Sequence, residues 1–403
     1  MRAALLDITG PGRAPVPAAA DPVARARALA PLIAAAAPRI EAERRLTPEV
    51  LEALHGAALF RTLLPRAYGG EEVTPATFVR MQEVVAAADA STAWCLGQAS
   101  GCSMAAAYME PAVAREIWGQ DPCAAVAWGM GNGLAVEGGV GYRATGTWRF
   151  ASGAKHATWI GGHCRVQERD GSPRRGPDGE PIERTVMVRA DRVRMVPAWD
   201  VMGLRGTGSD TYSVQDMFVP EEYTVRRDQD AERRVPGTLF LFSTTHLYAS
   251  GFAGVSLGIA RAMLDAFRAM AMAKTPAATT RPLRDSEVVQ CGLARAEAKL
   301  RSARAFLLEV LEEAWGAAAA RGHVSLDERV MIRLATTSAI HRAKEVAEWA
   351  YHEAGASAIF EDQPFERRMR DIHAAAQQVQ GRTAHLELCG QHFLGKTPHA
   401  RFL

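Results

Sequence analysis

The stretch Gly-Thr-Trp-Arg-Phe-Ala-Ser-Gly-Ala-Lys-His-Ala-Thr-Trp, at residues 146–159, decides the fold of this chain. Its first half completes a run of β-forming residues that starts at Tyr142. Aromatic and β-branched side chains favour the pleated, half-buried surface of a strand. We therefore predict a strand from Tyr142 to Phe150, followed by a turn at which Ser152 could cap the strand end.

Short β-type segments continue on both sides of this stretch. Gly138-Gly139, between Val136 and Val140, is typical of a hairpin turn. Further strands are predicted at residues 185–189 and 212–220, and a polar insert at 168–184 is predicted to be a surface loop. The sequence thus predicts a β domain at residues 121–230, which is an ordinary domain size.

Helical patterns flank the β domain. Before it, Thr47-Pro48-Glu49 combines an N-cap, a proline at the first helical position and an acidic residue at the positive end of the helix dipole. After it, apolar residues recur at helical spacing, as in bundle helices; they include Val255, Ile259, Met263 and Phe267. We predict a flexible tail at residues 1–20, an N-terminal helical domain at 21–120 and a C-terminal helical bundle at 231–403.

This order of segments predicts an α+β multidomain fold. A doubly wound sheet is disfavoured because it needs strands that alternate with helices. The clustered glycines of Gly129-Met-Gly-Asn-Gly133 do not match G-x-G-x-x-G. A nicotinamide-binding Rossmann unit is therefore not expected.

The composition excludes several classes of protein. The 403 residues carry 47 basic and 45 acidic side chains, a net charge of +2, so binding to nucleic acid or to an anionic membrane is not expected. No apolar run reaches the ~18 residues that span a bilayer. The six cysteines are scattered without C-x-x-C pairs. This pattern predicts reduced thiols in the cytoplasm and no metal site.

Three segments, in their order and spacing, resemble the acyl-CoA dehydrogenase superfamily. They are residues 146–159, the turn Gly203-Leu-Arg-Gly-Thr-Gly-Ser209 with the strand that follows it, and Phe365-Glu-Arg-Arg-Met-Arg-Asp371. The resemblance extends from about residue 25 to residue 395. It implies an N-terminal helical domain, a middle β barrel or sandwich and a C-terminal four-helix bundle. It also implies a flavin, FAD or FMN, between the β domain and the C-terminal helices of a homotetramer.

The resemblance assigns flavin-binding roles to several side chains. An isoalloxazine needs apolar walls and a few placed hydrogen-bonding groups. Trp128, Phe150 and Trp159 would supply walls, although each can equally be a core residue. The flavin edge would meet the 203–209 turn, which can also be a simple glycine turn; its candidates are Arg205, Thr207 and Ser209. Arg281 would meet a flavin phosphate or remain a solvated side chain.

Within the superfamily, the hydroxylase-type flavin monooxygenases match better than the dehydrogenases. Many dehydrogenases carry a catalytic glutamate eight residues after the Arg-Asp aspartate, but Val379 stands there, and an earlier helix offers only Asp265. Residues 152–159 are instead similar to the Ser-Gly-x-x-His-x-x-Trp segment of the monooxygenases. This similarity implies that the Ser152 hydroxyl hydrogen-bonds the flavin and stabilises its oxygen adduct. His156 is expected to be structural.

The acid–base residues depart from the pattern of the family. The monooxygenases usually carry a histidine seven residues after the Arg-Asp aspartate, where this chain has Gln378. Glutamine can orient a substrate but cannot take a proton near neutral pH. His373 is the candidate substitute, and His385 or His392 are alternatives, unless these histidines are merely solvated or satisfied in the core. The hydroxylases commonly carry a further histidine in the N-terminal domain, and the matching stretch of this chain, residues 93–100, offers Gln98 and Ser100 instead.

Three functions follow, in decreasing order of expectation. The first is a two-component flavin monooxygenase, which uses O2 and reduced flavin from a separate reductase to hydroxylate a small apolar or aromatic molecule. The second is an acyl-CoA dehydrogenase with a displaced base. The third is a non-catalytic scaffold, which the intact flavin-edge motif disfavours.

Overall fold

The structure is a computed structural model that describes residues 21–398 except 178, 228, 278 and 279. The predicted tail at residues 1–20 lies outside the described residues. The helices are α1 Pro22–Glu43, α2 Pro48–Gly56, α3 Pro75–Ala88, α4 Ala90–Ser103, α5 Pro111–Ala114, α6 Thr244–Ala273, α7 Glu287–Arg321, α8 Leu326–Ala354, α9 Glu366–Ala376 and α10 Ala384–Phe393. The strands are β1 Val126–Trp128, β2 Met130–Gly131, β3 Gly133–Glu137, β4 Gly141–Arg149, β5 Trp159–Gln167, β6 Glu183–Arg189, β7 Arg194–Val196, β8 Thr211–Pro220 and β9 Thr224–Val225.

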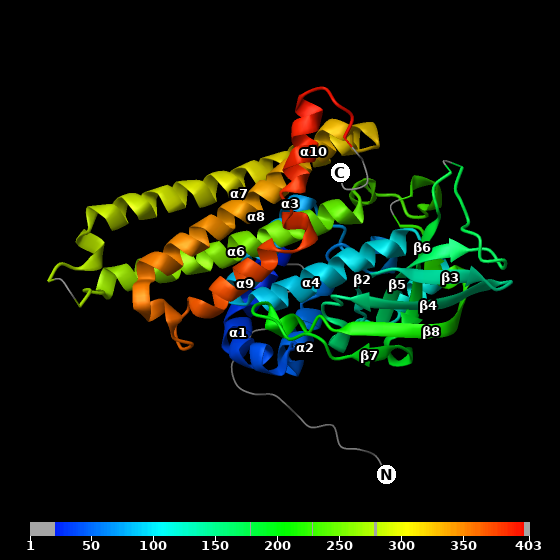
Figure 1. Ribbon diagram of the computed structural model, residues 1–403, viewed down its shortest axis with the longest axis horizontal. Helices are drawn as coiled ribbons and strands as arrows, with labels where there is room; N and C mark the ends of the chain where they lie inside the picture. The colour runs from blue at the N-terminus through cyan, green and yellow to red at the C-terminus, as the bar shows by residue number, and fades with distance from the viewer. Residues whose placement is uncertain (1–20, 178, 228, 278–279, 399–403) are drawn as a thin grey trace, which may run out of the picture.

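Along the chain, all described strands lie between two helical segments. In space, the strands gather at one end of the molecule, beside the helices (Figure 1). The α+β class and the α–β–α order are therefore confirmed. The predicted helix start at Pro48 is confirmed as well, but the Thr47 hydroxyl is buried and makes no capping hydrogen bond within the described part of the chain. Pro48 and Glu49 alone supply the N-terminal signal there.

The two helical segments share one apolar core. Helices α6, α7 and α8 lie side by side as three long rods, and α10 crosses α8 (Figure 1). From the N-terminal segment, α3 packs on α6, and α4 packs on both α6 and β1. Buried residues from both segments form a single cluster, for example Phe78 and Leu96 with Phe267 and Ile340. The C-terminal helical bundle is thus confirmed, whereas the domain boundaries at residues 120 and 230 stay predictions.

Helix α6 is the central element of this core. It is long and apolar enough to cross a membrane, but 83% of its most apolar 18-residue window is buried inside the protein. Its capping box, in which Ser243 and His246 bond reciprocally, fixes where the helix starts.

The nine strands found in the described part of the chain form one mixed sheet in the order β7-β8-β4-β3-β5-β6-β9, with β1 beside β5 and β2 beside β4. Strands β1 and β3 run parallel to β5, and the other pairs are antiparallel. The sheet encloses its own core, in which Trp148 stacks on Tyr212. Trp128 and Trp159 belong instead to the helical core. The start of β5 and all of β1 therefore lie against the helices, on the side where the family resemblance places the flavin.

Candidate functional site

The turn after β4 places Ser152 against the 203–209 turn. Phe150 has a φ of 62° and Gly153 a φ of 77°, so the chain reverses sharply in a backbone region that non-glycine residues seldom adopt. The backbone N–H of Gly153 donates to the Thr207 carbonyl over 3.0 Å. Ser152 is buried, with 5% of its surface exposed. Two motifs whose serines, Ser152 and Ser209, are 57 residues apart in sequence thus form one site.

A chain of hydroxyl groups runs through this site. The indole N–H of Trp94, on α4, donates to Ser152 Oγ over 3.1 Å. Ser152 Oγ lies 2.7 Å from Ser209 Oγ, which lies 2.7 Å from Thr207 Oγ1. The Thr207 hydroxyl donates to the Leu204 carbonyl over 2.8 Å. Because an N–H can only donate and a carbonyl can only accept, these two ends orient the chain from Trp94 to Leu204.

The third motif, residues 365–371, contacts the same turn through Asp371. The backbone N–H of Leu204 donates to Asp371 Oδ1 over 2.6 Å. Burial raises the pKa of the Asp371 carboxyl to about 7, helped by the charges of Asp89 and Glu41, while the Leu204 N–H and Arg367 oppose the shift. All three segments that carry the resemblance therefore meet at the 203–209 turn.

Aromatic side chains from α4 and α6 form a wall beside Ser152. The Trp94 ring stacks on Phe252 with ring centres 3.9 Å apart, and Phe252 stacks on Tyr248. Gln98 Nε2 donates to the Trp128 carbonyl and to the Tyr248 hydroxyl, each over 3.3 Å. Gln98 and Trp128, both singled out by the sequence, thus lie in one cluster with this wall.

The remaining predicted flavin-binding side chains differ in their exposure and in the groups that they contact. Phe150 is 58% exposed and its ring meets the edge of Trp199. Trp159 is buried and stacks on Tyr223. Arg205 points toward Glu41 of α1 at 4.0 Å, while its Nε is buried without a hydrogen-bond partner among the described residues. Their flavin contacts stay predictions.

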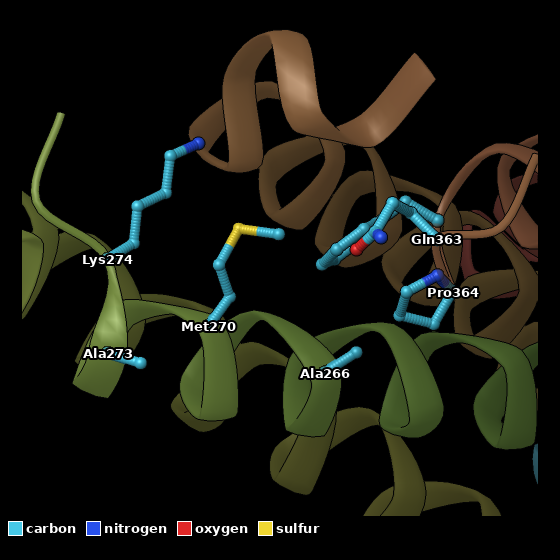
Figure 2. Close-up of a pocket in the computed structure, with 7 residues that line it drawn as sticks. Ala266, Met270, Ala273, Lys274, Gln363 and Pro364 are labelled. Atoms are coloured by element: carbon cyan, nitrogen blue, oxygen red, sulfur yellow. The ribbon is translucent and has the colours of Figure 1, made fainter. Parts of the chain in front are cut away.

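Arg281 lies in the α6–α7 connection, at the end of the long helices opposite the strands (Figure 1). Its guanidinium bonds to Glu287. A pocket of ≈ 370 Å³ opens where this connection begins, lined by Ala266, Met270, Ala273, Lys274, Gln363, Pro364 and Phe365 (Figure 2). Within one chain, this region is separate from the Ser152 site.

The candidate acid–base residues bond to groups outside the hydroxyl chain. His373 Nε2 is 3.3 Å from Glu348 Oε1 on α8. Gln378 Oε1 accepts the backbone N–H of Gln380 over 2.8 Å, and Gln378 Nε2 is buried without a hydrogen-bond partner among the described residues. His385 bonds to the Val379 carbonyl, and His392 pairs with Asp327. The catalytic roles of His373 and Gln378 stay predictions.

His156 packs beside Phe60, with ring centres 6.2 Å apart. Burial, together with the nearby His55, lowers the pKa of its imidazole to about 4. The ring is therefore neutral near pH 7, which is consistent with the structural role expected from the sequence. Over the described residues, no group of three or more His, Cys, Asp or Glu side chains could hold a metal ion.

Comparison with known proteins identifies the family. A family model described as "Acyl-CoA dehydrogenase, C-terminal domain" matches residues 250–381. An indole-3-acetate monooxygenase of Pseudomonas putida is 31% identical over 362 residues, which cover 90% of each chain. The chain belongs to the flavin-dependent monooxygenases of the acyl-CoA dehydrogenase superfamily. A pigment production hydroxylase of Rhodococcus erythropolis is 28% identical over 83% of this chain and 86% of its own length.

Solved structures agree with this assignment. XiaF from a Streptomyces species, in complex with FADH2 and glycerol, superposes with a TM-score of 0.86 at 25% identity and covers 95% of this chain and 97% of its own. The HsaA monooxygenase of M. tuberculosis gives a TM-score of 0.85 at 23% identity, over 95% and 99% of the two chains, and supports the fold alone. The enzyme is a flavin-dependent oxidoreductase. The family thus favours the first predicted function over acyl-CoA oxidation and over a scaffold.

The sequence interpretation missed the side chains that surround Ser152. Trp94, Tyr248 and Phe252 were not singled out, although Trp94, Gln98 and Cys102 recur at steps of four on one face of α4. This spacing is the signal that could have found them, because residues four apart on a helix share a face.

Proposed function

We propose that this monooxygenase hydroxylates a small aromatic molecule, using O2 and reduced flavin that a separate reductase delivers. The printed names of its relatives support each part. They include an FADH2-dependent resorcinol hydroxylase and a p-hydroxyphenylacetate 3-hydroxylase, each called an oxygenase component. A name of this kind implies a partner that supplies the reduced flavin.

The orientation of the hydroxyl chain is the observation that carries this proposal. The Ser152 hydroxyl accepts a hydrogen bond from the Trp94 indole N–H and donates its own proton to Ser209. It can therefore only accept a further hydrogen bond, through its remaining lone pair. Reduced flavin presents an N5–H donor, whereas oxidised flavin presents an N5 acceptor. Ser152 therefore suits the reduced cofactor, which supplies the electrons that activate O2.

The other groups at the site suit a flavin and an aromatic substrate. Arg205 Nε is a buried donor without a hydrogen-bond partner among the described residues, as the polar edge of an isoalloxazine would require. The stacked rings of Trp94, Phe252 and Tyr248 present a flat apolar wall. Aromatic faces of this kind favour an aromatic substrate over a flexible acyl chain.

A homotetramer would reconcile the position of Arg281 with its predicted contact to a flavin phosphate. Within one chain the α6–α7 connection lies far from Ser152, so another copy would have to supply this arginine. Large apolar side chains are exposed on the C-terminal helices and their connections, as an interface would require; they include Met272, Val288, Phe360 and Leu394.

We place the enzyme in the cytoplasm, since all six cysteines are free thiols.

The decisive experiment compares flavin redox states and then follows product. The purified enzyme is titrated anaerobically with FADH2, FMNH2 and the oxidised forms, and oxygenated buffer is then mixed in with an aromatic substrate. We expect reduced flavin to bind at least tenfold more tightly and an oxygen atom from ¹⁸O2 to enter the product. Tight oxidised FAD that is bleached by an acyl-CoA would support the dehydrogenase alternative instead.

A further inference from the structure

Arg227 is a cation without an anionic partner among the residues that the structure describes. Its guanidinium lies over the Trp128 ring, 5.1 Å from the ring centre, and the residue is half-buried. Within the described ranges, two other arginines lie over aromatic rings, and each is close to a carboxylate: Arg174 is 2.7 Å from Glu168, and Arg189 is 3.9 Å from Asp191. Among the described residues, no carboxylate lies within 4.0 Å of Arg227.

Two acidic side chains near Arg227 in sequence are already paired with other arginines. Glu232 is 3.8 Å from Arg226 and 3.6 Å from Arg184, and Asp230 is 3.3 Å from Arg233. A partly buried charge is costly unless an opposite charge or hydrogen bonds compensate for it. Arg227 therefore has unused capacity to bind an anion.

Arg227 lies at one end of the wall that starts at Ser152. Trp94, Gln98 and Cys102 follow one another along a single face of α4. Trp94 bonds to Ser152, and Gln98 bonds to the backbone of Trp128, the residue beneath Arg227. Eight residues of helix separate Trp94 from Cys102, which is about 12 Å at 1.5 Å per residue. This length suits one or two aromatic rings with a short acidic side chain.

The titratable groups at this end of the wall are held neutral. Burial raises the pKa of the Cys102 thiol to about 12, although the hydroxyl of Tyr248 and the charge of Arg227 lower it slightly. Burial also lowers the pKa of His163, whose ring meets the edge of Trp128, with a further contribution from Arg227. Neither group supplies a negative charge, so a bound carboxylate would meet no competing anion from them.

We propose that Arg227 binds the carboxylate of an aromatic acid, whose ring lies beside the wall of Trp94, Phe252 and Tyr248 with its reacting carbon toward Ser152. This inference rests on the proposed aromatic hydroxylation and specifies its substrate class. A guanidinium presents a planar pair of donors that matches a carboxylate, and the indole ring of Trp128 holds that plane in place.

The test uses matched acid and amide probes on the flavin-loaded enzyme. Indole-3-acetate and indole-3-acetamide form one pair, and p-hydroxyphenylacetate and its amide form another. Arg227→Gln should raise KM for the acids ten- to hundredfold and leave KM for the amides within twofold. Arg227→Lys should recover part of the loss. Arg189→Gln is the control, since it removes a guanidinium over Trp159 that already has an acidic neighbour; it should change neither KM.

The possible outcomes separate this inference from the proposed function. Equal effects of Arg227→Gln on acids and amides, in protein that melts and binds reduced flavin like wild type, would overturn the role of Arg227. So would a wild-type enzyme that hydroxylates resorcinol or another neutral aromatic compound but none of the acids. If the wild-type enzyme oxygenates no aromatic compound at all, the proposed function fails and this inference fails with it.

Discussion

Asp371 accepts the backbone N–H of Leu204 over 2.6 Å, and this hydrogen bond ties the C-terminal Arg-Asp motif to the turn that holds Ser209. Leu204 has a φ of 53°, which a leucine adopts only when its surroundings impose it. The Asp371 carboxyl is therefore part of the support of the 203–209 turn. Its protonation state should affect stability more than a surface carboxyl would.

The pKa of Asp371 gives a pH dependence with a defined sign. Because its pKa is about 7 in the folded protein and near 3.8 in the unfolded chain, the folded state binds more protons between these values. The free energy of unfolding should therefore fall as pH rises from about 4 to 7. Asp371→Asn stays neutral and keeps an acceptor for Leu204. The free energy of unfolding of this variant, relative to that of wild type, should therefore increase by on the order of 2 kcal/mol from pH 5 to pH 8.

Urea denaturation of both proteins at the two pH values measures this difference. Asp371→Ala is the control. It lacks the acceptor for the Leu204 N–H, so its free energy of unfolding should be about 1–3 kcal/mol lower than that of wild type at either pH. Parallel pH profiles for wild type and Asp371→Asn would show that the carboxyl titrates outside this range.

Gly203 lies where the turn passes close to the backbone of the Arg-Asp motif. A Cβ at this position would lie 2.1 Å from the Arg370 carbonyl oxygen, which is backbone and cannot rotate away. Gly203→Ala should therefore destabilise the protein by about 1–3 kcal/mol and weaken flavin binding by displacing the turn. Thermal unfolding and fluorescence titration with flavin measure both effects.

Gly316→Ala is the matched substitution. Gly316 lies inside α7, where an added Cβ would meet no atom of the described residues within 4 Å, so alanine should be neutral or stabilise the helix by up to about 1 kcal/mol. Equal stability of the two alanine variants would mean that the turn can move without cost.

His156 should make the protein less stable in acid. Its pKa is about 4 in the folded state against 6.5 in the unfolded chain, so the unfolded state binds more protons as pH falls through this interval. The free energy of unfolding of His156→Leu should be similar to that of wild type at pH 8 and larger by on the order of 2 kcal/mol at pH 4.5. A variant that keeps its turnover within about threefold would support a structural role, whereas loss of turnover without loss of stability would assign His156 to the reaction.

Local sequence patterns predicted the elements of the site but not all of their contacts. The β4 strand follows from its β-forming residues, and α2 starts at Pro48 because proline fits the first helical position. The positive φ of Phe150 was not predictable, since that backbone region favours glycine. The hydrogen bond from Trp94 to Ser152 joins residues 58 apart, and local preference carries no information on such a pairing.

The family resemblance singled out the 203–209 turn as a predicted flavin contact, whereas physical patterns did not. Arg205, Thr207 and Ser209 look like an ordinary glycine turn, and only the fold brings Thr207 and Ser209 within 2.7 Å of each other and next to Ser152. The position of Arg281 was not predictable from local patterns. Its predicted flavin contact would need a second copy of the chain, and local patterns carry no information on assembly.

The Ser152–Ser209 hydrogen bond should set the preference for reduced flavin. In Ser209→Ala, the Ser152 hydroxyl loses its acceptor and regains a proton that it can donate to the N5 atom of oxidised flavin. We expect the ratio of dissociation constants, oxidised over reduced, to fall about five- to tenfold, as one net hydrogen bond of ~1 kcal/mol implies. Anaerobic fluorescence titrations with both redox forms measure this ratio.

Ser152→Ala and Trp94→Phe separate the cofactor contact from its support. Ser152→Ala removes the acceptor itself, so reduced flavin should bind more weakly and product formed per O2 consumed should fall about tenfold. Trp94→Phe keeps an aromatic ring against Phe252, 3.9 Å away in the wild type, but removes the donor to Ser152. That variant should lose less product per O2 than Ser152→Ala. If Ser209→Ala leaves the redox preference unchanged while Ser152→Ala abolishes it, the hydroxyl of Ser152 acts alone, and the chain from Trp94 to Leu204 does not orient its proton.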